Sequence, residues 1–431
     1  MGRWISSAWV DVACASACVG VALKPNRQHA IIKNAIRRFI LIVFAFLFGF
    51  MLKSVMTNFM YENGSKIILG NYGEDVLAGE IKNRDAKKVL IHYGGQSVIK
   101  SGLFDRIKGA LGNAGIKWVE YGGVVANPLK GHALKGVELA KKEKVDFVLA
   151  VGGGSVIDSA KLICAGAVND DIWSYYLDSK KVITGALPLG VVLTIPAAGS
   201  ECSISTVIRD EETGRKHTMM HNVLRSKFAF INPEYCFTLP KEQIAFGASD
   251  ILAHMLERYF SPEQNVVTTD KILTGAIHAV MEIAPRVYAD KADYANMAEF
   301  CLLGTLAHNG MLALGRVIQS WESHMIEMGF ISGHYNFAHG QGLSIIFPAW
   351  LKYMATKRPE KVKQFEKEVV TIKELEKWYK SLDLPTRLSD LNIDVMEAKE
   401  VIKKSFKPDV KLGGYGELSL DDILAVVRLA K

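Results

Sequence analysis

The sequence predicts an α/β domain with a Rossmann-like, mostly parallel sheet, followed by an all-α domain. The first observation is that short β-branched runs alternate with helical patterns and glycine turns between about Lys66 and Pro233, which is typical of parallel sheets. The second is that strand signals almost vanish after about Leu239, where helical periodicities such as "KEQIAFGASDILAHMLERYF" take over. The two regimes indicate two domains of different class.

Five apolar runs, in chain order, predict the strands of the first domain. They are "SKIILG", "KKVLIHYGG", "VDFVLAVGGGS", "PLGVVLTIPAAGS" and "SKFAFINP". With 431 residues, the chain is long enough for both domains to bury large cores. We expect an atypical N-terminal extension at 1–55, the α/β domain at 56–238 and the helical domain at 239–431. The second boundary falls in "FTLPKEQ", because Pro240 can begin a helix.

The formal net charge of +7 is concentrated at the N-terminus. Residues 1–55 hold seven Lys or Arg residues against the single acid Asp11, so the rest of the chain is nearly neutral. Binding a phosphate backbone needs a basic surface. We therefore expect no nucleic-acid partner.

The cysteines are scattered along the chain without any C-x-x-C pair. Their spacing argues against both a disulfide framework and a thiolate zinc site, and it favours a reducing compartment. They are Cys14, Cys18, Cys164, Cys202, Cys236 and Cys301.

A glycine turn in "AVGGGSVIDSAKLICAG" is the first candidate binding element. A buried strand ending at Val151 runs into Gly152–Gly154, then Ser155, then a helix that carries Asp158. Glycines let a backbone approach a ligand closely, and the amides at a helix start favour a pyrophosphate. The spacing is not G-x-G-x-x-G, so a tight strand-to-helix turn without a ligand stays an open alternative.

A second glycine turn, in "LIHYGGQSVIKSG", follows another apolar strand. Gly94, Gly95 and Ser97 sit where the adenosine end of a dinucleotide can lie. No Asp or Glu follows the glycines to pair with a ribose 2′-hydroxyl, which favours a cofactor with a 2′-phosphate. An ordinary turn is the alternative.

The helical half contains a candidate metal site. Asp250 and His254 are four residues apart on a helical pattern, so both point from one face and can reach the same ion. His324 precedes a glycine-rich break, and His339 starts the next helix. His334 lies between them but is not expected to bind the metal. One carboxylate and three imidazoles suit Fe(II) or Zn(II).

Together these pieces resemble the iron-containing alcohol dehydrogenase family, in particular its NADPH-dependent butanol dehydrogenase branch. The resemblance runs from about Thr57 to the C-terminus. The stretches that match the family are "NGSKIILG", "YGGQSVIKSGLFD", "EKVDFVLAVGGGSVIDSAK", "LPLGVVLTIPAAGSECS", "DILAHMLERYF" and "AHGQGLSIIFPAWLKYM".

The resemblance implies a dehydroquinate synthase-like two-domain plan, a homodimer, and hydride transfer between NADPH, rather than NADH, and a short-chain aldehyde such as butanal. It also implies a catalytic Fe(II) or Zn(II) that polarises the carbonyl oxygen. The implied metal ligands are Asp250, His254, His324 and His339. The implied cofactor contacts are Gly94, Gly95, Ser97, Gly153, Gly154, Ser155, Asp158, Thr194 and Lys216.

Two departures from the family pattern keep alternatives open. Many members have a histidine at the position of Met328, and the interval from His324 to His339 is one residue longer than usual, which places an insertion near Met328, Gly329 and Phe330. One alternative is a nucleotide- and metal-binding protein without turnover. The other is a related glycerol dehydrogenase or dehydroquinate synthase-like lyase.

The stretch "RRFILIVFAFLFGFMLK", from Arg37 to Lys53, is close to a membrane anchor. As a helix its apolar part, Phe39–Leu52, would span about 21 Å at about 1.5 Å per residue, against a hydrocarbon core of roughly 30 Å. Because the resemblance begins beside Met56, we interpret the segment as an upstream extension of the reading frame, with translation starting at Met56 or Met51. A cytoplasmic protein is expected, and N-terminal membrane anchoring is the alternative.

Overall fold

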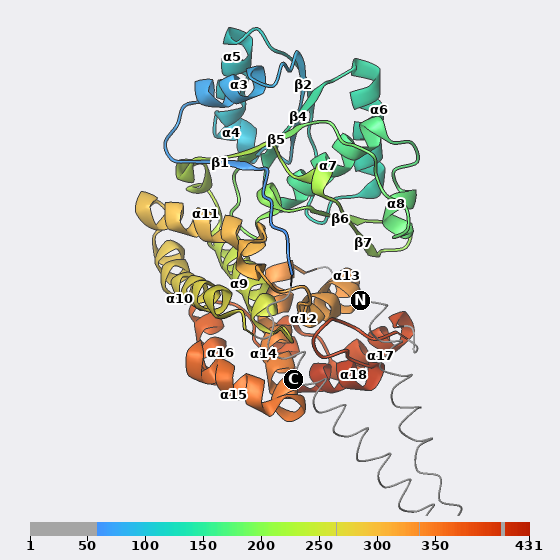
Figure 1. The fold of residues 1–431 in the computed structure, drawn as a ribbon, viewed down its shortest axis with the longest axis vertical. Coiled ribbons are helices and arrows are strands. Elements are labelled where there is room, and N and C mark those ends of the chain that lie inside the picture. Colours follow the sequence, from blue (N-terminus) through green and yellow to red (C-terminus); the bar gives the residue numbers. More distant parts are fainter. Residues whose placement is uncertain (1–57, 264, 336, 407–409) are drawn as a thin grey trace, which may run out of the picture. The chain divides into compact units, whose positions relative to one another are not determined.

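The computed structural model describes residues 58–263, 265–335, 337–406 and 410–431. They belong to one compact unit, Met56–Lys431, which Figure 1 shows as a ribbon. The extension at 1–55 lies outside the described residues, so its interpretation stays a prediction. Within the described part of the chain, no helix has the length and apolar character needed to cross a bilayer.

A six-stranded sheet forms the first half of this unit. Its order is β1-β8-β5-β4-β2-β3, and each pair of neighbours is parallel. This confirms the predicted parallel sheet. The strands are β1 (Lys66–Leu69), β2 (Lys88–Tyr93), β3 (Lys117–Tyr121), β4 (Phe147–Gly152), β5 (Leu189–Leu193) and β8 (Phe228–Ile231).

Helices cover both faces of the sheet (Figure 1). Val89 and Ile91 of β2 pack into one core with α3 and α5, whereas Leu90 packs into another with α6 and α7. Successive side chains of a strand point to opposite faces, so a strand covered on both sides is apolar throughout. The helices are α3 (Glu74–Lys82), α4 (Ser97–Lys100), α5 (Leu103–Asn113), α6 (Lys130–Glu143), α7 (Gly154–Val168) and α8 (Ser174–Leu177).

The remaining strands form an antiparallel hairpin, β6 (Ser205–Arg209) with β7 (Lys216–Met220). The apolar runs did not predict this hairpin or β3. Short 3₁₀ turns connect several elements of the chain. They are η1 (Ser200–Cys202), η2 (Asn222–Leu224), η3 (Pro233–Cys236), η4 (Met311–Ala313) and η6 (Leu388–Leu391).

The second half is helical, as predicted. Helix α9 is its centre, since nearly every residue from Ile244 to Tyr259 is buried. Helices α10, α11 and α14 all pack against α9. The helices are α9 (Lys241–Tyr259), α10 (Val267–Ala289), α11 (Tyr294–His308), α12 (Glu322–Ile326), α13 (Ser332–Tyr335), α14 (His339–Lys357), α15 (Pro359–Glu368), α16 (Ile372–Ser381), α17 (Val395–Ser405) and α18 (Leu420–Leu429).

The loop after β5 fits closely between helices α9 and α11 because glycines line the contact. A Cβ atom at Gly247 of α9 would lie 2.5 Å from the carbonyl oxygen of Pro196. A Cβ atom at Gly199, whose φ is +71°, would lie 2.6 Å from the carbonyl oxygen of Gly304 in α11. Side chains at these positions would push the loop away. The carboxyl edge of the sheet is therefore held directly against the helices that carry Asp250 and His308.

Candidate metal centre

The four predicted metal ligands converge on one point. Asp250 and His254 project from the same face of α9, His324 lies in α12, and His339 is the first residue of α14. The Oδ1 atom of Asp250 lies 3.3 Å from Nε2 of His254, 3.6 Å from Nε2 of His324 and 3.7 Å from Nε2 of His339. Helices far apart in sequence thus bring one carboxylate and three imidazole nitrogens together.

The spacing of these atoms fits a bound cation better than hydrogen bonds alone. Ligands about 2.1 Å from a tetrahedral ion lie about 3.4 Å from each other. Oδ1 of Asp250 and Nε2 of His324 are buried and have no hydrogen-bond partner among the described residues, and buried polar atoms are rarely left without one. Ligand atoms of Asp250, His254 and His324 all lie within 4.8 Å of one another. This donor set is suited to Fe(II) or Zn(II).

The local charges keep two of these groups in a form that can bind a cation. Burial alone would raise the pKa of the Asp250 carboxyl, but the surrounding histidines hold it well below its usual range. Burial lowers the pKa of His254 to about 4, and the nearby Asp250 only partly opposes this. Near neutral pH the site therefore contains an ionised carboxylate and a neutral imidazole at His254.

Each metal-site histidine has a hydrogen-bond partner at its other ring nitrogen. Nδ1 of His324 lies 3.2 Å from Oε1 of Glu257, and Nδ1 of His339 contacts Glu327. Nδ1 of His254 lies 2.8 Å from Nδ1 of His308. Such partners fix ring orientation and tune ligand basicity. The sequence reasoning missed all three.

Trp321 packs on the histidine cluster with a strained backbone. Its ring centroid lies 5.3 Å from those of both His254 and His324. The φ angle of Trp321 is +58°, a left-handed conformation that is unfavourable for a bulky residue. Strain of this kind, of about 1–3 kcal/mol, persists where the surrounding structure requires it. The indole gives one side of the site an apolar wall.

A π-helical turn, Glu327–Ile331, lies between His324 and His339. It contains Met328, Gly329 and Phe330, where the sequence predicted a one-residue insertion. A π turn holds one more residue than the corresponding α turn, so it can take up an insertion. The turn also places Glu327 against the first turn of α14. There a Cβ atom at Gly342 would overlap the Glu327 side chain.

The predicted cofactor-binding turns lie at the carboxyl edge of three neighbouring strands. Gly94, Gly95 and Ser97 follow β2, Gly153–Ser155 follow β4, and Thr194 follows β5. Ligands of α/β sheets bind at this edge. A Cβ atom at Gly95 or Gly154 would have no atom within 4 Å, so the backbone there faces open space.

Lys216 and Asp158 have different surroundings. Nζ of Lys216, at the start of β7, lies 3.3 Å from Oγ of Ser332. Burial lowers the pKa of Lys216, and the charges of Glu327 and Asp250 oppose that shift. The carboxylate of Asp158 is hydrogen-bonded to other groups of the protein. It accepts hydrogen bonds from Ser200 Oγ at 2.7 Å and from the Val207 amide at 3.0 Å.

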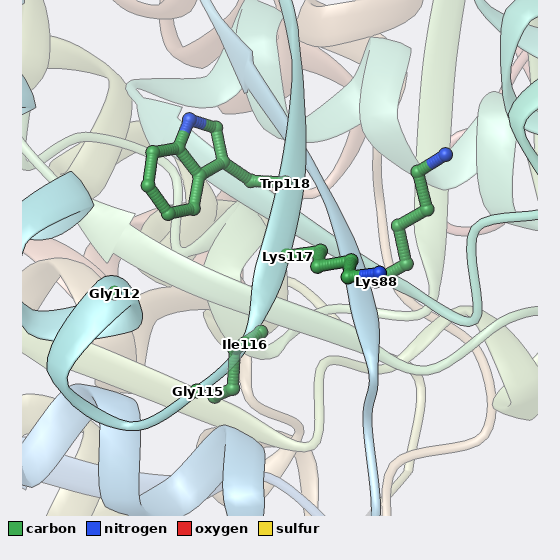
Figure 2. Close-up of a pocket in the computed structure, with 6 residues that line it drawn as sticks. All are labelled: Lys88, Gly112, Gly115, Ile116, Lys117 and Trp118. Carbon is green, nitrogen blue, oxygen red and sulfur yellow. The ribbon is translucent and has the colours of Figure 1, made fainter.

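A surface pocket lies at the end of the sheet opposite the predicted cofactor-binding turns. None of the predicted site residues lines it. Lys88 and Lys117 are the first residues of β2 and β3, so the pocket lies at the amino ends of these strands. Lys88 is paired with Glu143 at 2.7 Å. Figure 2 shows the lining, which consists of Lys88, Gly112, Gly115, Ile116, Lys117 and Trp118.

Comparison with known proteins identifies the chain's family. The family model described as iron-containing alcohol dehydrogenase matches residues 64–233. The model of the C-terminal region of Fe-containing alcohol dehydrogenases matches residues 244–430. The chain belongs to the iron-containing alcohol dehydrogenase family.

Curated relatives and solved structures agree with this membership. NADH-dependent butanol dehydrogenase A of Clostridium acetobutylicum is 33% identical over 393 residues, which cover 86% of this chain and 99% of the relative. NADPH-dependent aldehyde reductase of Escherichia coli (strain K12) is 33% identical over 386 residues, covering 85% and 97%. The crystal structure of NADH-dependent butanol dehydrogenase A from Thermotoga maritima has a TM-score of 0.81 and 37% identity, covering 87% of this chain and 99% of that one. This chain is thus an NAD(P)-dependent alcohol dehydrogenase.

We expect metal uptake by this alcohol dehydrogenase to release a proton. Burial lowers the pKa of His324, but Asp250 and Glu257 outweigh it and raise that pKa to about 9 in the metal-free protein. A ligand imidazole must be neutral, so the metal displaces the proton below that pH. Apparent metal affinity should therefore fall as pH decreases below about 9. Calorimetry in buffers of different protonation enthalpy measures the number of protons released per metal ion bound. An equal number above and below this pH would contradict the prediction.

Proposed function

We propose that this enzyme exchanges a hydride between NADPH and short-chain aldehydes such as butanal, and that Asp250, His254, His324 and His339 bind its divalent metal. The observation that carries the proposal is the convergence of the three Nε2 atoms on Oδ1 of Asp250. When bound, Fe(II) or Zn(II) supplies a Lewis acid for the carbonyl oxygen of the substrate. Reduced nicotinamide supplies the hydride.

The chain's own residues hold the reactants in place. The ionised Asp250 offsets the charge of the cation, and the neutral imidazole of His254 offers a lone pair. We propose that Lys216, whose Nζ lies 3.3 Å from Oγ of Ser332 just after the π-helical turn, donates a hydrogen bond to the nicotinamide ribose. Trp321 excludes water from one side of the site and gives an uncharged aldehyde an apolar contact. Orientation of this kind is the main contribution of a protein to cofactor chemistry.

The glycine turns are the proposed binding site for the dinucleotide. The α7 helix begins at Gly154 beside open space, so its first amide groups and positive dipole end suit the pyrophosphate. Gly153 and Ser155 complete this turn, and Thr194 lies at the end of the adjacent strand β5. Because Asp158 is hydrogen-bonded internally, we propose that it acts by positioning the loop at Ser200.

NADPH is the proposed cofactor. After β2, the exposed turn of Gly95, Gln96 and Ser97 carries no acidic residue, and Lys100 in the following helix is exposed. An acid at this point would favour a free 2′-hydroxyl, whereas a neutral or basic turn favours a 2′-phosphate. The relatives differ from each other, since the names of two specify NADH and that of one specifies NADPH.

An assay of aldehyde reduction tests the proposed function. Metal-loaded enzyme with butanal should consume NADPH, which is measured as a loss of the near-ultraviolet absorbance of the reduced nicotinamide. The kcat/KM with NADPH should be higher than that with NADH. Protein purified without added metal and analysed for iron and zinc identifies the ion. If either metal is bound but neither nicotinamide is oxidised with any short aldehyde, the alternative of a nucleotide- and metal-binding protein without turnover, suggested by Met328, replaces our proposal.

Three further proposals concern the molecule as a whole. We propose a cytoplasmic location, which four free, buried cysteines among the described residues support. We also propose a homodimer, which rests on the family resemblance alone. We also propose the division of the described unit at 56–238 and 239–431, which the change from sheet to helices supports.

A further inference from the structure

His308 lies behind the metal-site histidine His254. It is the last residue of α11, and its ring meets that of His254 edge to face, with centroids 4.6 Å apart. Nδ1 of His308 lies 2.8 Å from Nδ1 of His254. The opposite nitrogen of His254, Nε2, is the atom that lies 3.3 Å from Oδ1 of Asp250. His308 therefore contacts a proposed ligand from the side away from the metal position.

Arg258 determines which histidine donates in this contact. A guanidinium nitrogen of Arg258 lies 3.2 Å from Nδ1 of His308. A guanidinium can only donate, so Nδ1 of His308 must be an acceptor. The hydrogen between the two Nδ1 atoms then belongs to His254, and the single lone pair on Nδ1 of His308 is shared between this hydrogen and the Arg258 donor. In a neutral imidazole this leaves the lone pair on Nε2 of His254, which faces Asp250.

The other nitrogen of His308 ties the pair to the sheet half. With Nδ1 accepting, Nε2 of His308 carries the hydrogen and donates to Oγ of Ser205 at 3.3 Å. The carbonyl oxygen of Ser205 accepts a bond from Lys161 at 2.8 Å. Lys161 belongs to α7, the helix that begins at the Gly154 turn. His308 is thus held by both halves of the described unit.

The partner of His254 differs in kind from those of the other two metal-site histidines. His324 and His339 each contact a buried carboxylate, Glu257 or Glu327. His254 instead contacts the imidazole of His308, whose Nδ1 accepts and whose Nε2 donates. An imidazole that donates its N–H to a neutral acceptor is a weaker base than one that donates its N–H to a carboxylate.

We propose that His308 is a positioning residue that, together with Arg258, holds His254 in the tautomer whose Nε2 binds the metal. This rests on the proposed metal function. Without the acceptor, the Nδ1 hydrogen of His254 loses its partner, and the ring can rotate or change tautomer. Loss of such a partner typically weakens metal binding about 10- to 100-fold.

Two substitutions separate the acceptor from the volume of the ring. His308→Phe keeps a ring without nitrogen, whereas His308→Asn has no ring but places an oxygen close to the former Nδ1. We expect the phenylalanine variant to raise the zinc dissociation constant about 10- to 100-fold, and the asparagine variant to stay within about threefold of the unchanged protein. Chelator competition measures zinc affinity, and the visible spectrum of the Co(II)-loaded protein reports the ligand geometry.

The possible outcomes distinguish this inference from the proposed metal function. If the unchanged protein binds no divalent metal, the proposed function fails. If it binds zinc but the phenylalanine variant has the same affinity and the same cobalt spectrum, the role of His308 is refuted. Equal losses in both variants refute it too, because they would indicate packing rather than an acceptor. Thermal unfolding of the metal-free proteins checks folding, and His308→Leu replaces the phenylalanine variant if that one does not fold.

Discussion

Replacing Asp250 with alanine is expected to abolish stoichiometric metal binding and to lower kcat/KM at least about 10³-fold, a loss of about 4 kcal/mol in transition-state stabilisation. Oδ1 of Asp250 is the atom on which the three histidine Nε2 atoms converge. It also supplies the negative charge that offsets the cation. Metal analysis after gel filtration and steady-state kinetics with added zinc or iron measure the two effects.

The same substitution should leave nucleotide binding almost intact. Asp250 belongs to α9, whereas the glycine turns follow β2 and β4 at the edge of the sheet. We expect the dissociation constant for NADPH, measured by quenching of protein fluorescence, to change less than about threefold. Asp170→Ala is a matched control, because Asp170 is fully exposed and pairs with Lys141. Unchanged metal stoichiometry in Asp250→Ala would show that the ligand assignment is wrong.

Replacing Lys161 with methionine is expected to destabilise the protein by about 3–5 kcal/mol. The Lys161 amine is fully buried and donates to the carbonyl oxygens of Ser200, Ser203 and Ser205 at 2.7, 3.1 and 2.8 Å. Burial lowers its pKa to about 8, despite Asp158 and Glu201 nearby, so it is still largely protonated near neutral pH. Methionine fills similar space but leaves three carbonyl oxygens without this donor and removes the positive charge near Asp158 and Glu201.

Urea unfolding of the metal-free protein measures this loss. Lys142→Met is the control, because Lys142 is exposed on α6, and its midpoint should be close to that of the unchanged protein. The loop from Ser200 to Ser205 contacts both Asp158 and His308, so activity should decrease as well. If the two variants unfold at the same denaturant concentration, the buried ammonium does not stabilise the loop.

The sequence predicts the central strands because they are covered on both faces. The residues of β4 and β5 are all buried, so these strands read as continuous apolar runs. The edge strand β3, "KWVEY", has Lys117 and Glu120 exposed and its other residues half-buried. The β6–β7 hairpin is also partly exposed and contains Arg209 and Lys216. Neither produces a continuous apolar run, so the pattern did not reveal them.

Sequence spacing could indicate part of the candidate site where the spacing itself carries geometry. Asp250 and His254 share a helix face at an interval of four, which a sequence shows directly. His308 is 54 residues from His254, and only the packing of α11 on α9 brings them together. Glu257 is an exception, because it lies three residues after His254 and so had a local signal. The ligand and cofactor roles themselves stay predictions until variants are measured.

The π-helical turn at Glu327–Ile331 has a consequence for how such proteins are recognised. One extra residue in an α-helix turns everything after it by about 100°, since the helix has 3.6 residues per turn. His339 begins a separate helix, α14, and lies 3.7 Å from Asp250 together with the other histidines. A π turn can therefore take up an added residue while the four proposed ligands stay close together. A search pattern with a fixed interval between these two histidines would reject this chain, whereas one that allows a single added residue would retain it.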